Sequence, residues 1–188
     1  MNSYRHELQL ENLRGIPIML QHGSDDDNVP VYHARWMAGE LQRKRLDVEY
    51  HELPGVGHWF KGVMTTPHLT RFYERALQLD VESRPVPSRF TFICANPADT
   101  GSMYGLRIVH LDDPGQLGRV SVEYDDVQGN WLIRTSNIAA LTIPPRLCSR
   151  QAVHIDDCQV AYDSACVHET GLSLAKESEK GWKVGHAA

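Results

Sequence analysis

The chain has 188 residues, of which 41% are hydrophobic and 23% are charged. This composition excludes an intrinsically disordered chain, and the length suits one medium domain or two small ones. The 19 basic residues are outnumbered by 24 acidic ones, which gives a formal net charge of −5. The chain therefore lacks the basic character of nucleic-acid-binding proteins, and we expect no nucleic-acid partner.

The longest apolar stretches have about five residues, far fewer than the roughly 20 needed to cross a bilayer, so we expect no membrane span. The N-terminal residues contain no apolar segment of a secretory signal. The four cysteines form no C-x-x-C pair and no spacing of a zinc site. An even number of cysteines allows disulfides without requiring them, so cysteine usage leaves the localisation of the protein open.

Residues 16–80 alternate short apolar runs with amphipathic stretches. The expected elements in chain order are a strand at 16–20, a helix at 31–45, a strand at 48–53 and a helix at 69–77. The first strand is continuously apolar, which is typical of a strand buried on both faces of a parallel sheet. Pro17 is tolerated near its start, where the N–H is not needed. This order predicts the α/β class with parallel strands.

A different periodicity begins after a proline-containing linker, which we place at residues 82–89. Apolar residues then alternate with polar ones, and turn-forming residues separate the runs. Such a pattern predicts a small antiparallel β-sandwich or barrel-like domain, which we place at residues 90–168. Residues 169–188 show no clear periodicity, and we expect them to form a weakly ordered tail.

Two loops carry side chains suited to catalysis. Residues 22–30 directly follow the first predicted strand, and residues 55–60 directly follow the second. Because the carboxyl ends of parallel strands meet at one edge of a sheet, active sites form there. The 32 positions between Asp26 and His58 suit one crossover helix and one return strand. Topology therefore predicts that a carboxylate meets an imidazole.

The same loops resemble a known family. The segment QHGSDDDNVP at residues 21–30, followed by VEYH at residues 48–51 and Gly57-His58, is similar to the end of the α/β-hydrolase domain of prolyl-oligopeptidase-type serine peptidases. The resemblance covers roughly residues 14–80. It implies that residues 1–81 are the C-terminal portion of such a catalytic domain.

The resemblance also implies roles for individual residues. Asp26 would be the triad acid that orients the catalytic histidine, and His58 would be the general base. Spacing alone leaves Asp25 and Asp27 open as the orienting acid, and a solvated acidic turn is the simpler alternative. Asn28 is implied as a substrate contact.

Two aromatic residues and one histidine beside these positions have less certain roles. Trp59 and Phe60 are candidates for lining the substrate pocket, although covering the sheet edge is the simpler role. His22 is expected to brace its loop. Of these three residues, we assign only Trp59 to substrate binding.

The triad implied by the resemblance requires a serine on a G-x-S-x-G turn ahead of the acid. Only Ser3 and Ser24 are available there, and neither has this context. Ser102, between Gly101 and Gly105, is the nearest imitation, but a turn between strands explains it better. We therefore expect this chain alone to be inactive and not to react with a fluorophosphonate probe.

We interpret the chain as part of a prolyl-oligopeptidase-like serine hydrolase that transfers acyl groups to water. The full-length parent would act on a peptide or ester substrate. The β-rich half is similar to an accessory domain that follows such hydrolase domains in fungal secreted or predicted peptidases. We expect no cofactor and no metal site, because His154, Asp156, Asp157, Cys158 and His168 match no standard ligand spacing.

The alternative function is a non-catalytic binding module or pseudoenzyme that uses residues 90–145 for recognition. In either case the strand at 16–20 lacks the preceding strands of a complete domain. We therefore expect self-association through its exposed edge, or poor solubility.

Overall fold

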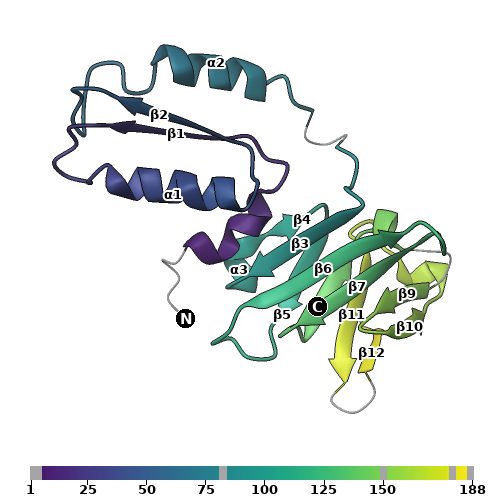
Figure 1. Ribbon diagram of the computed structural model, residues 1–188. Coiled ribbons are helices and arrows are strands. Elements are labelled where there is room, and N and C mark those ends of the chain that lie inside the picture. Colours follow the sequence, from purple (N-terminus) through teal and green to yellow (C-terminus); the bar gives the residue numbers. More distant parts are fainter. Residues whose placement is uncertain (1–5, 81–83, 149–151, 178–180, 186–188) are drawn as a thin grey trace. The chain divides into compact units, whose positions relative to one another are not determined.

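The computed structural model describes residues 6–80, 84–148, 152–177 and 181–185. The chain divides into two compact units, of which the first spans His6–Pro85 and the second is formed from Val86 onward (Figure 1). The division falls within the linker expected at 82–89, part of which lies outside the described residues. No helix among the described residues is long and apolar enough to cross a membrane.

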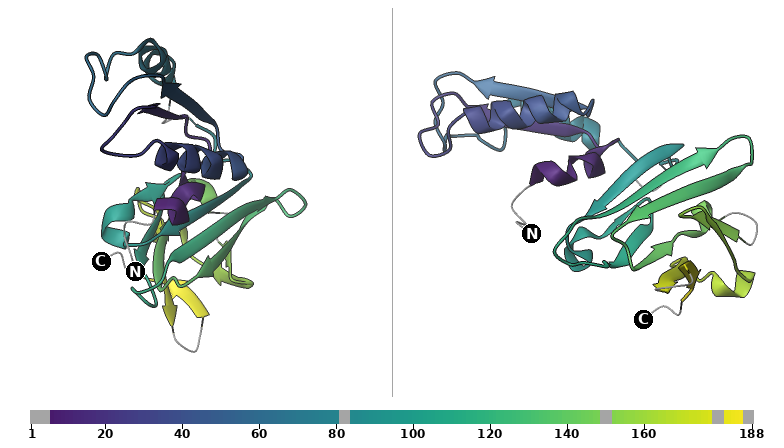
Figure 2. Two further views of the ribbon diagram at one scale, coloured as in Figure 1. Left: turned by 60° about the vertical axis from the view of Figure 1, so that its left-hand side comes forward. Right: turned by 60° about the horizontal axis from the view of Figure 1, so that its bottom comes forward.

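The first unit is a mixed α/β structure. Its elements are η1 (His6–Leu13), β1 (Ile18–Gly23), α1 (Tyr32–Arg43), β2 (Val48–Leu53) and α2 (Pro67–Ala76). β1 and β2 pair in parallel, with Ile18 opposite Val48 and Gly23 opposite Leu53. Both views place α1 on one side of the strand pair and α2 on the other (Figure 1 and Figure 2). The strand–helix–strand–helix order and the parallel pairing are therefore confirmed.

Local sequence signals set the ends of these elements. β1 begins directly after Pro17, which has no N–H to give to a neighbouring strand. α1 is followed by Arg45 in the left-handed region, at φ 55°. α2 begins after Thr66, whose hydroxyl accepts a hydrogen bond from the N–H of Leu69 at 3.3 Å.

A small core lies between α1 and the strands. Leu41 of α1 is buried together with Leu10 and Leu46, and Ile18 and Leu20 of β1 pack against them. Leu10 comes from η1, which the sequence did not predict because its apolar residues are not confined to one face. This cluster ties the helix to the sheet.

One expectation for the first unit is wrong. β1 is half-buried instead of buried on both faces, because among the described strands it pairs only with β2 and its other edge is open. The amphipathic pattern that predicts the second helix includes Tyr73 and Leu77 among its apolar positions, and both residues are exposed.

The second unit is built from two five-stranded sheets, with the orders β10-β9-β7-β6-β3 and β12-β11-β8-β5-β4. Its elements are β3 (Arg89–Cys94), α3 (Pro97–Thr100), β4 (Ser102–Met103), β5 (Leu106–His110), β6 (Gly118–Asp125), β7 (Asn130–Ser136), β8 (Ala140–Ile143), η2 (Pro145–Leu147), β9 (Ala152–Ile155), β10 (Cys158–Ala161), η3 (Ser164–Cys166), β11 (Leu172–Glu177) and β12 (Gly181–Val184). All pairs are antiparallel except β7 with β9, which is parallel. Antiparallel sheets in this half were expected, whereas the parallel pair was not.

Both sheets contribute to one hydrophobic core. Phe92 and Val120 come from one sheet, and Leu106, Leu141 and Leu174 come from the other, and all belong to a single buried cluster. Each of these side chains is at most 2% exposed. The arrangement is that of a two-layer sandwich, in which side chains on the inner faces alternate with outward-facing ones.

The expectation of a weakly ordered tail at 169–188 is wrong for the residues described there. β11 pairs with β8, and Leu172 and Leu174 are core residues. Trp182 of β12 is also buried, and its indole N–H donates to Asp156 at 2.8 Å. β11 follows Gly171 and β12 begins at Gly181, and each strand contains only two large apolar residues, so their alternation is too brief to recognise in the sequence.

Candidate active site

The loops that follow β1 and β2 are joined by main-chain hydrogen bonds. The N–H of Ser24 donates to the carbonyl of Leu53 at 2.9 Å, and the N–H of Asp25 donates to the carbonyl of Val56 at 3.0 Å. The N–H of Gly55 donates to the Ser24 hydroxyl at 2.9 Å. The two loops therefore form one rigid edge at the carboxyl ends of the strands.

Gly23 makes this close approach possible. A Cβ atom at this position would lie 2.2 Å from the carbonyl oxygen of Val56 and 2.8 Å from that of Gly57. Both are backbone atoms, so a side chain could be accepted only by moving the loop. Close packing between the two loops thus requires a glycine at position 23, directly after His22.

Asp26 and His58 are hydrogen-bonded to each other. Nδ1 of His58 lies 2.9 Å from Oδ2 and 3.1 Å from Oδ1 of Asp26. A carboxylate only accepts, so Nδ1 carries a proton, and in the neutral ring Nε2 carries the lone pair. Among the described residues no hydrogen bond is made to this Nε2. His58 therefore presents Nε2 away from Asp26.

The Asp26 carboxylate is held by main-chain donors as well. Its side chain is 5% exposed, and Oδ1 accepts from the N–H groups of Asn28 at 3.0 Å and Val29 at 2.8 Å. Burial acts to raise the pKa of Asp26, but the hydrogen bonds from Val29, His58 and Asn28 outweigh it and lower the pKa. The group is therefore a carboxylate at neutral pH.

His22 braces the acid loop. Its Nε2 lies 2.8 Å from the carbonyl oxygen of Val29 and 3.3 Å from Oδ2 of Asp26. Because both partners accept, Nε2 is the protonated nitrogen. The Asp26 carboxylate consequently lies between two imidazoles, and only that of His58 has its Nδ1 turned toward it.

A depression of about 290 Å³ lies at this edge. Asp26 and His58 line it together with His22, Phe60 and Val63. Phe60 and Val63 come from the loop after β2, so this loop supplies the apolar wall of the depression. Such a concave site with a few polar groups suits a small substrate group.

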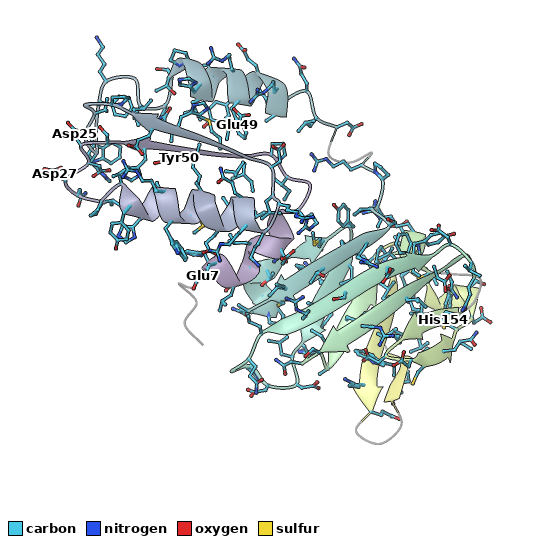
Figure 3. The ribbon with its side chains drawn as sticks, viewed as in Figure 1. Glu7, Asp25, Asp27, Glu49, Tyr50 and His154 are labelled. Atoms are coloured by element: carbon cyan, nitrogen blue, oxygen red, sulfur yellow. The ribbon has the colours of Figure 1, made fainter. Side chains whose placement is uncertain are left out.

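The other acidic residues of the loop do not reach His58. Asp25 is exposed and accepts a hydrogen bond from the Ser24 hydroxyl at 2.6 Å. Asp27 is exposed, and Figure 3 shows both residues at the tip of the loop. Of the three acids that spacing left open, only Asp26 contacts the imidazole.

The two residues expected to bind substrate are both exposed. Asn28 is exposed, and its described hydrogen bond is the one from its main-chain N–H to Asp26. Trp59 is 80% exposed, and its ring meets the His58 ring edge-on at 5.2 Å between centroids. Trp59 is not among the residues that line the depression, and its role, in substrate binding or in covering the sheet edge, stays a prediction.

Gln21 positions the loop that carries His58. Its amide donates to the carbonyl of Val63 at 3.2 Å, and its carbonyl oxygen accepts from the hydroxyl of Thr66. The sequence places Gln21 in the motif but gives no sign of these partners, which are 42 and 45 residues away.

An ion pair beside the site was also missed. Arg35 of α1 makes two hydrogen bonds to Glu52 of β2, at 2.8 and 2.6 Å, and the Tyr50 hydroxyl donates to the same carboxylate at 2.9 Å. The hydrogen bonds from Arg35 and Tyr50 lower the pKa of Glu52 to about 2. The only sign of this ion pair in the sequence is that Tyr50 and Glu52 are two positions apart and therefore lie on the same face of the strand.

The remaining candidates lie in the second unit or outside the described residues. Ser3 is not described. Ser102 begins β4, and the β4–β5 turn contains Tyr104 and Gly105 at positive φ, so Ser102 belongs to a hairpin. The described residues contain no cluster of three or more metal-binding side chains. Asp156 and Asp157 have φ of 48° and 62°, as in the turn of a hairpin.

The four cysteines, Cys94, Cys148, Cys158 and Cys166, are free thiols. Burial raises the pKa of the Cys94 thiol and that of the Cys148 thiol, which disfavours the reactive thiolate form of both.

Comparison with known proteins gives two matches and one negative result. An uncharacterized secreted protein of Arthroderma benhamiae is 35% identical over 136 residues, which are 72% of this chain and 15% of that protein. A stretch of this length includes parts of both units, so the similarity extends beyond the first. No solved structure matches the chain. Residues 1–79 match the prolyl oligopeptidase family.

Proposed function

We propose that the first unit supplies the acid and the base of a serine hydrolase of the prolyl oligopeptidase type. Asp26 would hold the imidazole of His58, and His58 would take the proton of a serine hydroxyl and return it to the leaving group. The observation that carries this proposal is the contact between Nδ1 of His58 and Asp26 at 2.9 Å, with Nε2 directed elsewhere.

The nucleophile would come from a segment that precedes residue 1 in a longer polypeptide. In α/β-hydrolases the chain order is serine, acid and histidine, so this position follows from the order of Asp26 and His58. The match to a protein of which this chain spans 15% is consistent with such a parent. The reaction would be acyl transfer to water, with a peptide or ester substrate, and it would need no cofactor.

The alternative of a non-catalytic binding module receives less support. A match to a peptidase family over residues 1–79 favours retention of catalytic groups. The Asp26 side chain is only 5% exposed and contacts His58, whereas the carboxylate of a solvated acidic turn would be exposed, so this also favours a catalytic pair.

The experiment is fluorophosphonate labelling of the product of the complete reading frame. We expect a G-x-S-x-G segment upstream of residue 1 and labelling of its serine. Asp26→Asn and His58→Ala should each slow the labelling by about a thousandfold. In Asp26→Asn the base loses its orientation, and in His58→Ala the serine loses its base.

Asp27→Asn is the matched control, because it removes the same charge from the neighbouring exposed residue. Its labelling should equal that of the wild type. A complete protein that is not labelled, or one in which Asp26→Asn and Asp27→Asn behave alike, would refute the proposal.

A further inference from the structure

The second unit carries a groove of its own, with a volume of about 830 Å³. It lies over the sheet β12-β11-β8-β5-β4, on the face opposite the core. Ile108, Leu141 and Leu174 of this sheet are at most 1% exposed and face the core. Because side chains alternate along a strand, Arg107 and Ser173 face the groove.

A row of polar side chains crosses the floor of this groove. Ser102 of β4 pairs with Arg107 of β5, Arg107 pairs with Thr142 of β8, and Thr142 pairs with Ser173 of β11. Paired residues point to the same face of a sheet, so one guanidinium and three hydroxyls stand side by side. With strands about 4.8 Å apart, the row is roughly 14 Å long.

The next row of paired residues across the same face contains small side chains and leaves space above the sheet. His110 pairs with Ala140, and Ala140 pairs with Ala175. Ala175 in turn pairs with Lys183 of β12, so two adjacent alanines leave open space between His110 and Lys183. Pro97 and Ala98, at the start of α3, also line the groove. The result is a polar strip beside a shallow apolar channel.

The charge of the groove is opposite to that of the chain. Its described lining residues include Arg107 and His110 but no aspartate or glutamate, although the chain has 24 acidic residues against 19 basic ones. Arg107 is exposed and makes no ion pair among the described residues. A guanidinium offers a planar fork of N–H donors that fits a carboxylate with two parallel hydrogen bonds.

We propose that this groove binds an extended acidic segment of another polypeptide. Arg107 would pair with a carboxylate of that segment, and the hydroxyls of Ser102, Thr142 and Ser173 would bind its polar groups. About four extended residues span 14 Å at roughly 3.3 Å per residue, so the row matches a short peptide. The described lining contains no tryptophan, tyrosine or phenylalanine ring on which a sugar could stack, which argues against an acidic polysaccharide.

The test is fluorescence anisotropy with the 188-residue chain and a labelled hexapeptide of alternating glutamate and serine. The glutamate peptide should bind, and the matched glutamine peptide should not. Arg107→Gln should weaken binding by about tenfold or more, because it removes a charge-assisted pair. Ala140→Leu should also weaken it, since the larger side chain fills the channel without changing the net charge.

Arg119→Gln is the matched control, because Arg119 is an exposed arginine of β6 in the other sheet and its loss changes the net charge equally. Binding to this variant should equal that of the wild type. Thermal melting establishes that all three variants are folded. The proposal is overturned if the glutamate peptide does not bind, or if Arg119→Gln weakens binding as much as Arg107→Gln. It is also overturned if polygalacturonate binds in the groove and the peptide does not.

Discussion

At the scale of single residues, the direction of each hydrogen bond decides the chemistry of the site. Asp26 receives N–H donors from Asn28, Val29 and His58, so it remains a carboxylate and fixes the proton of His58 on Nδ1. His22 adds a further donor at 3.3 Å. If the His58 ring rotated, the wrong ring nitrogen would face a nucleophile. The groups that hold the Asp26 carboxylate in place therefore also hold the His58 ring in one orientation.

Glu52 supports the strand that carries the site, and its contribution depends on pH. Its pKa is about 2 in the folded state, against an ordinary value of 4.5. A lowered pKa means that the ion pair with Arg35 stabilises the fold fully above about pH 4.5, and that this contribution is lost as the pH falls toward 2. Glu52→Gln should therefore lower the melting temperature at pH 7 and lower it much less at pH 2.5. The effect is modest because the Arg35 side chain is 57% exposed.

Circular dichroism melting at the two pH values measures this difference. Glu74→Gln is the control, because Glu74 is an exposed acid of α2 and makes no ion pair among the described residues. An equal loss of melting temperature for Glu52→Gln at both pH values would contradict the account.

At the scale of elements, the site depends on how closely the β1 loop approaches the β2 loop. Gly23→Ala should destabilise the chain by about 1–3 kcal/mol, because its Cβ would overlap the backbone of Val56 and Gly57. Gly39→Ala in α1 is the matched control. The Cβ of this variant meets nothing within 4 Å, so alanine should stabilise the helix by up to about 1 kcal/mol. Urea unfolding distinguishes the two, and equal stability of Gly23→Ala and wild type would contradict the packing argument.

Much of the element order could be predicted because it follows from hydrophobic periodicity. The parallel pairing placed Asp26 and His58 at one edge, and the family resemblance selected Asp26 from three adjacent acids. Contacts set by register could not be predicted, such as Arg35 with Glu52. The strands at 172–177 and 181–184 were missed because each contains only two large apolar residues, which display little alternation against a background of turns.

At the scale of the whole molecule, the open edges of the first unit predict self-association. β1 and β2 pair only with each other among the described strands, which leaves main-chain donors and acceptors at both edges. Ile16 is 45% exposed and Leu77 is 86% exposed, which adds apolar surface. Light scattering should show a mass that rises with concentration. A constant mass of one chain up to high concentration would contradict this expectation.

The central claim is that Asp26 fixes His58 with its proton on Nδ1 and its lone pair on Nε2. Nitrogen-15 NMR of the 188-residue chain at pH 8.5 measures this tautomer directly, because the two ring nitrogens differ in chemical shift when one is protonated. We predict the Nδ1–H form for His58 in the wild type and in Asp27→Asn, and loss of that preference in Asp26→Asn. A wild-type His58 in the Nε2–H form, or one unchanged by Asp26→Asn, would contradict the account.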